Sequence, residues 1–164
     1  MCTWRSVILI YVTVGTAHKP FISLLSTIDE FNKTHHKEII AQIGHSTYVP
    51  RYYRWFRFCS PQEMQDYIQE AELIVSHGGL AIIGECLRRG KPLIVVPRNP
   101  EEAVNPQNEL VEFLCQEGYL AAVSAGEELL PYLLGEIHPP QRRFDFKSAT
   151  PELVAQFVSE ILNQ

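Results

Sequence analysis

One continuous apolar run near the start of the chain constrains the fold more than any other feature. Residues 7–14 read Val-Ile-Leu-Ile-Tyr-Val-Thr-Val, without alternation of polar and apolar side chains. A β-prone run of this kind suits a strand that is covered on both faces, as in a parallel sheet. Arg5 before the run loosely imitates a secretory signal, but the run is short for one. We therefore expect a central strand that ends at Gly15 and Thr16.

Segments of strand and helix character alternate along the rest of the chain. Further strands are predicted at 38–43, 52–58, 73–75, 93–96 and 119–123. Helical spacing of apolar residues predicts helices that open at Pro20, over 61–71, 80–89 and 107–116, after Ser124 and from Pro151. This alternation predicts an α/β fold with a doubly wound, mainly parallel sheet. We expect one Rossmann-like domain over 1–164, with 136–164 as a C-terminal tail and helix.

Local signals predict where several of these helices begin and which side chains they bury. Ser60 and Glu63 form a capping-box pattern before one helix, and Ser124 and Glu127 offer a second before another. Gly90 is expected to end the helix over 80–89. The residues expected to face inward from the helix over 107–116 are Leu110, Val111 and Leu114.

Composition and charge exclude some classes of function. Apolar residues make up 46% of the chain and charged residues 20%, which is typical of globular rather than disordered chains. The formal net charge of -5 argues against general nucleic-acid binding, which needs a basic face. No apolar segment is long enough to cross a bilayer. Any membrane association is therefore expected to come through a surface or a partner.

The four cysteines do not form a metal-binding pattern. They stand at Cys2, Cys59, Cys86 and Cys115, without a pair at zinc-ligand spacing. Two disulfides would suit a secreted protein, whereas three of these residues lie in or beside apolar segments. We therefore expect reduced thiols in or near the core.

Two glycine-bearing turns follow predicted strands. One is Gly15-Thr16, and the other is His77-Gly78-Gly79, which leads directly into a helix. In open α/β sheets, ligands collect at the carboxyl ends of the strands. Glycines let a ligand approach the backbone, and a helix N-terminus offers free N–H groups and a partial positive charge. A diphosphate is the simplest guest for such turns, although either turn could be only a tight turn.

The order of residues around the second turn resembles a known family. Residues 71–79 read Ala-Glu-Leu-Ile-Val-Ser-His-Gly-Gly, Glu85 follows, and residues 90–97 read Gly-Lys-Pro-Leu-Ile-Val-Val-Pro. This pattern resembles the C-terminal, donor-binding domain of glycosyltransferase family 28. It is similar to the short, separately encoded form of that domain, such as the PssE-type subunits and the small subunit of the dolichol-linked N-acetylglucosaminyltransferase. The resemblance covers residues 7–123 and includes Val-Thr-Val-Gly-Thr at 12–16 and Gln-Ile-Gly at 42–44.

The resemblance implies roles for nine residues. Gly15 and Thr16 would face the interdomain cleft near the donor, and Phe58 is placed like the family residue beside the uracil ring. The resemblance implies that the diphosphate contacts His77, Gly78 and Gly79. It implies that the ribose hydroxyls contact Glu85 and that the donor sugar contacts Gln107. Arg98 would contact phosphate or sugar. The donor would be a UDP-sugar, so no separate cofactor is implied.

Each assignment has a structural alternative. Phe58 could pack in the core, and His77 could simply cap the helix that follows. Glu85 could be a solvated helix residue, and Gln107 could only begin its helix. One departure from the family concerns Pro106, which stands where the family usually has histidine and lacks both an imidazole and an N–H donor.

The resemblance also implies a mechanism. The metal-dependent GT-A class of transferase usually holds its metal with Asp-x-Asp, and the three aspartates here, Asp29, Asp66 and Asp145, do not form that motif. An inverting GT-B reaction without metal is implied, in which a helix N-terminus and donors such as His77 stabilise the leaving diphosphate. The general base is not identified by the sequence.

A second chain is expected to complete the active site. By resemblance, a membrane-associated subunit would hold a lipid-linked saccharide acceptor, which would place this chain in the cytoplasm, peripheral to a membrane. The alternative is a non-catalytic module that binds a nucleotide or a partner, which Pro106 favours. An unrelated dinucleotide-binding domain is disfavoured because the first turn lacks GxGxxG.

Overall fold

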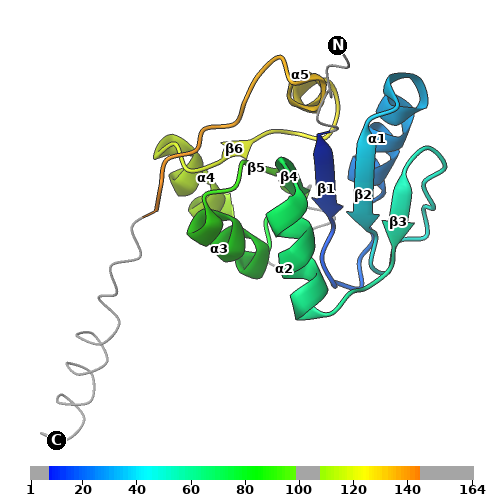
Figure 1. Cartoon of the computed structure of the whole chain (residues 1–164), viewed down its shortest axis with the longest axis horizontal. Coiled ribbons are helices and arrows are strands. Elements are labelled where there is room, and N and C mark those ends of the chain that lie inside the picture. Colours follow the sequence, from blue (N-terminus) through cyan, green and yellow to red (C-terminus); the bar gives the residue numbers. More distant parts are fainter. Residues whose placement is uncertain (1–7, 99–107, 145–164) are drawn as a thin grey trace, which may run out of the picture.

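Six parallel strands form a single sheet in the part of the chain that the structure, a computed structural model, describes: residues 8–98 and 108–144. Their order across the sheet is β3-β2-β1-β4-β5-β6 (Figure 1). The strands are β1 (Leu9–Thr13), β2 (Glu38–Gln42), β3 (Arg54–Phe56), β4 (Leu73–Ser76), β5 (Leu93–Val95) and β6 (Ala121–Ala122). The prediction of a doubly wound parallel sheet is confirmed.

Helices cover both faces of this sheet (Figure 1). One face packs against α1 (Ile22–His35) and against the 3-10 turn η1 (Glu127–Leu129) with α5 (Leu130–Leu134). The other face packs against α2 (Pro61–Glu70), α3 (Leu80–Arg89) and α4 (Asn108–Gln116). The expectation that residues 136–164 form a tail and helix stays a prediction, because residues 145–164 lie outside the described part.

The unbroken apolar character of the first strand follows from this double cover. Ile10 and Val12 belong to the core that α1 completes, whereas Tyr11 between them packs with α2 and α3. All three side chains are at most 1% exposed. A strand buried on both faces has no solvent-facing side, so its sequence carries no polar alternation.

Several predicted helix boundaries are confirmed and one is shifted. Ser60 accepts from the backbone N–H of Glu63, and the Glu63 carboxylate accepts from the backbone N–H of Ser60, so the capping box at α2 is complete. Gly90 ends α3 in the left-handed conformation, with φ 63°. Helix α1, however, begins at Ile22 rather than at Pro20. The Pro20 carbonyl instead accepts a hydrogen bond from Arg98, 3.1 Å away, and is thereby drawn into the preceding loop.

Three other expectations are wrong in detail. The predicted strand over 52–58 is reduced to β3, which pairs on one side only because it lies at the sheet edge. Ser124 bonds Glu128 rather than Glu127, because a 3-10 turn intervenes before α5. Leu110 is 39% exposed, since α4 buries only the side that carries Val111 and Leu114.

The described cysteines fit the predicted reduced state. Cys59, Cys86 and Cys115 are free thiols in this part of the chain, and Cys2 lies outside it. Burial raises the pKa of the Cys86 thiol to about 12, so it is protonated at neutral pH. Of the helices in 8–98 and 108–144, none combines the length and apolar character that a membrane crossing requires.

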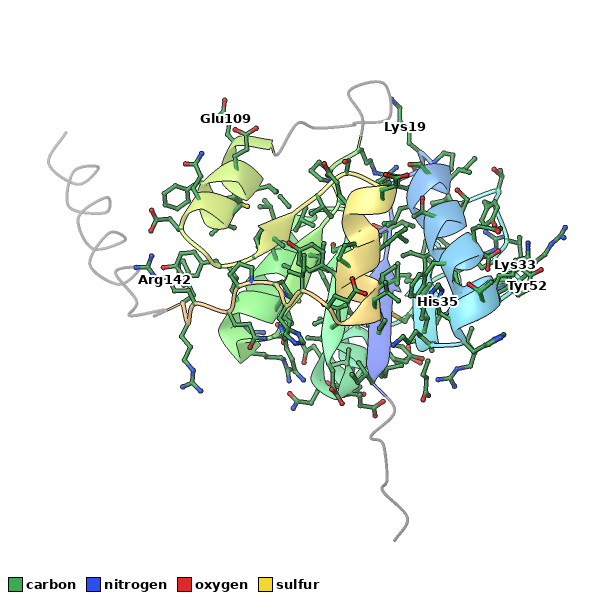
Figure 2. All side chains as sticks on the ribbon, turned by 90° about the horizontal axis from the view of Figure 1, so that it is seen from above. Lys19, Lys33, His35, Tyr52, Glu109 and Arg142 are labelled. Carbon is green, nitrogen blue, oxygen red and sulfur yellow. The ribbon has the colours of Figure 1, made fainter. Side chains whose placement is uncertain are left out.

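The strand order identifies one position where a ligand site is expected. From β1 the chain builds outward through β2 and β3, and from β4 it builds in the opposite direction through β5 and β6. Ligands of doubly wound sheets bind outside the carboxyl ends of the strands at this switch point. Figure 2 shows Lys19, in the loop after β1, and Glu109, at the start of α4, along the same edge of the molecule. The switch point between β1 and β4 brings the two predicted glycine turns together.

Candidate functional site

The His77 side chain lies across the switch point between β1 and β4. Its backbone N–H donates to the carbonyl of Thr13 at 3.2 Å, and its ring Nδ1 lies 3.4 Å from the same oxygen. The N-cap of α3 is Gly79, and no side chain caps this helix. The interpretation of His77 as a simple helix cap is therefore wrong. The first N–H groups of α3 are left without a side-chain acceptor, as an anion site requires.

Glycines stand where the loops around this ring come closest together. Gly15 has φ +73° and Gly78 has φ +90°, conformations that L residues rarely adopt. A Cβ atom on Gly15 would lie 2.4 Å from Cε1 of His77. On the outer side, a Cβ atom on Gly44 would lie 2.6 Å from the carbonyl oxygen of Gly15. The loops after β1, β2 and β4 thus meet with no room for side chains at these glycines.

Arg98 fastens the loop after β1 to the end of β5. Its Nη2 donates to the carbonyl of Val14 at 3.0 Å, and its Nη1 donates to the carbonyls of Lys19 and Pro20 at 2.8 and 3.1 Å. The guanidinium also lies 4.9 Å from the ring centroid of the buried Phe21. These contacts make Arg98 a support of the loop that carries Gly15. Its predicted contact with phosphate or sugar stays a prediction.

The electrostatic environment favours a neutral His77. Burial and, secondarily, the nearby Arg98 guanidinium lower the pKa of the imidazole below its ordinary value, and the Thr13 carbonyl opposes them. The carbonyl near Nδ1 favours a hydrogen on that atom, which leaves a lone pair on Nε2 in the neutral ring. An anion bound at the turn would favour uptake of a proton at Nε2.

The lowered pKa predicts an effect of pH on folding stability. The unfolded chain binds a proton at His77 near pH 6.5, whereas the folded chain does so only at lower pH. The stabilising contribution is thus complete above about pH 6.5 and is lost as the pH falls from there toward the lower pKa of the folded state, at up to roughly 1.4 kcal/mol per pH unit. Urea unfolding between pH 7.5 and 5.5 should show a steeper loss for the wild type than for His77→Gln. The exposed His45→Gln serves as the control, and equal slopes in wild type and His77→Gln would contradict the assignment.

Phe58 lies on an exposed row of aromatic rings at the same edge. The side chain is 47% exposed, so packing in the core is excluded. Its ring centroid lies 4.9 Å from that of His45, which lies 4.5 Å from that of His18. The row runs from the loop after β1 to the segment after β3. A flat base could stack on such a row, but contact of Phe58 with a uracil ring stays a prediction.

Glu85 is buried in α3 and paired within the helix. It is 7% exposed, so the reading as a solvated residue is wrong. The carboxylate contacts the guanidinium groups of Arg88 and Arg89, one turn further along. Arg89 in turn donates to the side-chain oxygen of Gln69 on α2 at 2.8 Å. The structure thus joins Glu85 to the packing of α3 on α2, and its contact with ribose hydroxyls stays a prediction.

The remaining predicted site residues divide into two groups. Thr16 is exposed beside Gly15, so its side chain is open to a ligand or to solvent. Gln107 and the departure at Pro106 lie outside the described residues. Within residues 8–98 and 108–144, no group of three or more His, Cys, Asp or Glu side chains could hold a metal ion.

Two residues at the switch point were missed as site residues by the sequence analysis. Thr13 is 3% exposed, its hydroxyl accepts from the N–H of Gly15 at 3.1 Å, and its carbonyl meets His77. Gly44 packs directly on Gly15. A signal for Gly44 was present in its position, because it ends a strand at the same sheet edge. The role of Thr13 depends on which strand lies beside β1.

The chain is similar to a known protein family and to a curated protein. The model of the glycosyltransferase family 28 C-terminal domain matches residues 9–164. The human UDP-N-acetylglucosamine transferase subunit ALG13 is 34% identical over 120 residues, which cover 68% of this chain and 10% of that protein. The chain therefore spans about a tenth of the length of this curated relative.

Solved structures show the same fold at lower identity. A transferase described as the glycotransferase of kitacinnamycin superposes with TM-score 0.62 at 20% identity, covering 79% of this chain and 34% of that one. MurG of Acinetobacter baumannii superposes with TM-score 0.60 at 17% identity, covering 86% of this chain and 45% of that one. These superpositions show that the chain shares its fold with these two proteins.

Proposed function

This chain belongs to glycosyltransferase family 28, whose C-terminal domain it contains, and on that premise we propose that it is the nucleotide-sugar-binding subunit of an inverting GT-B glycosyltransferase. The donor is a UDP-sugar that carries a hexose or an N-acetylhexosamine. Among these, UDP-N-acetylglucosamine is favoured by the relative named as a transferase subunit for that sugar. The donor binds without metal, and no separate cofactor takes part.

The observation that carries this proposal is the turn at the switch point. There Nε2 of His77, two left-handed glycines and the uncapped N-terminus of α3 meet at one sheet edge. N–H donors and the helix dipole stabilise negative charge at such a place. A diphosphate is the part of a nucleotide sugar that needs this stabilisation.

The chemistry is a displacement at the anomeric carbon of the donor sugar. The bond from that carbon to the diphosphate oxygen breaks, and UDP leaves with the bonding electron pair. The bond from the same carbon to an acceptor hydroxyl forms from the opposite face, and the hydroxyl proton passes to a base. The uncapped end of α3 and a protonated His77 stabilise the charge that develops on the leaving diphosphate.

The acceptor and its base belong to a second chain in this proposal. Glu85, the carboxylate assigned to the site, is engaged with two arginines and is not proposed as the base. The partner is a membrane-associated subunit that binds a lipid-linked saccharide and supplies the base. This arrangement places the chain at the cytoplasmic side of a membrane through its partner.

A non-catalytic binding module is the alternative function. Pro106 favours it, because this position lacks the imidazole that the family usually carries next to Gln107. Such a module would keep nucleotide binding and lose transfer. Measurements of binding and of transfer therefore separate the two functions.

The direct test is calorimetric titration of UDP-N-acetylglucosamine into the purified chain. We expect binding in metal-free buffer and the same affinity with EDTA present. Absence of binding at millimolar ligand, both for the chain alone and for the chain with its partner, would overturn the proposal. Binding that EDTA abolishes would overturn its metal-free part.

Glu85→Ala tests whether the buried carboxylate reaches the ribose. If it does, UDP-N-acetylglucosamine should bind more weakly by roughly 1.5–3 kcal/mol, the scale of hydrogen bonds to a charged group. If Glu85 only joins α3 to Arg88 and Arg89, the variant should lose folding stability and keep its affinity. Arg88→Ala is the matched control, because it breaks one of the same ion pairs and leaves the carboxylate in place. Equal affinities in wild type and Glu85→Ala would assign the residue to structure alone.

A further inference from the structure

Gly79 is a glycine that its own backbone does not require. It has φ -64° and ψ 137°, an extended conformation that every L residue adopts readily. It is also the N-cap of α3, a position where Ser, Thr, Asp, Asn and Gly are preferred, the first four because their side chains accept from the helix N–H groups. The backbone conformation therefore does not require a glycine, and the N-cap position accepts a glycine without requiring one.

The neighbouring imidazole does explain it. A Cβ atom on Gly79 would lie 2.8 Å from Nε2 and 2.9 Å from Cε1 of His77. A Cβ atom on Gly15 would lie 2.4 Å from Cε1 and 2.6 Å from Nε2 of the same ring. One edge of the ring thus fits between two backbones that carry no side chain, while Nδ1 lies near the carbonyl of Thr13.

We propose that Gly79 and Gly15 are positioning residues that seat the His77 imidazole across the switch point. Because neither glycine has a side chain, the ring can lie against both backbones, with Nε2 between the two turns. With Nδ1 committed to the Thr13 carbonyl, Nε2 is the ring atom available to a bound anion. The glycines then act through His77 rather than through contact with the donor. The part of this inference that concerns ligand binding rests on the proposed function.

A different role for Gly79 gives a different experimental result. If the glycine only let the diphosphate approach the backbone, Gly79→Ala would weaken binding equally with and without His77. If it seats the ring, the effect of Gly79→Ala depends on the presence of the ring. A double-mutant cycle of Gly79→Ala and His77→Ala separates these cases.

Gly84→Ala is the matched control for the added methyl group. Gly84 lies inside α3, and a Cβ atom there meets nothing within 4 Å. This variant should unfold at the wild-type temperature or above it, since alanine favours helix. It should also keep the wild-type affinity.

Binding and unfolding are measured for the wild type, both single variants and the double variant. Gly79→Ala should lower the affinity for UDP-N-acetylglucosamine about tenfold when His77 is present, and less than about twofold in the His77→Ala background. The unfolding temperature should fall by about 3 °C or more in the first background and not in the second. Equal effects of Gly79→Ala in the two backgrounds would overturn the proposal.

Nitrogen NMR of the imidazole tests the seating without any ligand. The wild-type His77 should show the tautomer with hydrogen on Nδ1, and Gly79→Ala should change the ratio of the two tautomers, whereas Gly84→Ala should not. An unchanged His77 spectrum in Gly79→Ala would overturn the proposal. If the wild type fails to bind UDP-N-acetylglucosamine, the proposed function fails, and the unfolding cycle with the NMR spectrum still decides the role of the glycines.

Discussion

Transfer of sugar to a lipid-linked acceptor should be at least about a thousandfold faster for the paired subunits than for this chain alone. The edge at the switch point is open, because Thr16, His18 and His45 are exposed. An open site admits water, which weakens electrostatic stabilisation of the leaving group and allows hydrolysis. A second subunit would close the edge, orient the acceptor hydroxyl and supply the base. Each of these contributions raises the rate only when the partner is present.

The measurement uses UDP-N-acetylglucosamine with a labelled sugar and membranes that contain the acceptor lipid. The chain is assayed alone, with a co-expressed candidate partner, and against the partner alone as the control. Rapid transfer by the chain alone would refute the requirement for a second subunit. Absence of transfer in every preparation, with donor binding intact, would favour the non-catalytic module.

Replacement of Arg98 by methionine should cause the largest loss of folding stability among the variants considered, roughly 2–4 kcal/mol. Methionine keeps an apolar stem but donates no hydrogen bonds to the carbonyls of Val14, Lys19 and Pro20. It also removes the cation from the ring of Phe21. Because the released loop carries Gly15, donor binding should fall with stability. Urea unfolding and calorimetry measure the two effects.

Two control variants separate the effect of the Arg98 loop contacts from the loss of an arginine or of its charge. Arg142→Met removes a comparable arginine, which donates to the Glu117 carbonyl and lies over the Tyr119 ring, far from Lys19 (Figure 2). Its loss should stay below about 1 kcal/mol, because the side chain is exposed. Arg98→Lys keeps the charge without the planar fork, so it should preserve the low pKa of His77 and lose most of the loop contacts. Equal stabilities of Arg98→Met and Arg142→Met would refute the supporting role of Arg98.

Patterns of residues close together in the chain were enough to predict the layered architecture and the place of the candidate site. The unbroken run over 7–14 predicted a strand buried on two faces, which the structure has at Leu9–Thr13 with Ile8 exposed before it, and the pattern at Ser60 and Glu63 predicted the start of α2. These features depend on residues close together in the chain, so local chemistry decides them. The glycine turns after two strands likewise pointed to the sheet edge where β1 and β4 meet.

The contacts of each side chain at this edge depend on segments that are far apart in the chain. Arg98 bonds the carbonyl of Val14 across 84 residues, and His77 meets the carbonyl of Thr13 across 64. Glu85 and Phe58 show the same limit, since one is buried between arginines and the other is exposed beside His45. Local periodicity predicts the face on which most side chains lie, with Leu110 as an exception, whereas the partner of a side chain depends on strand order and loop packing. Gly79 is an example, because its extended backbone suits any L residue. The proposed reason for a glycine there is the His77 ring, which lies against the Thr13 carbonyl on β1.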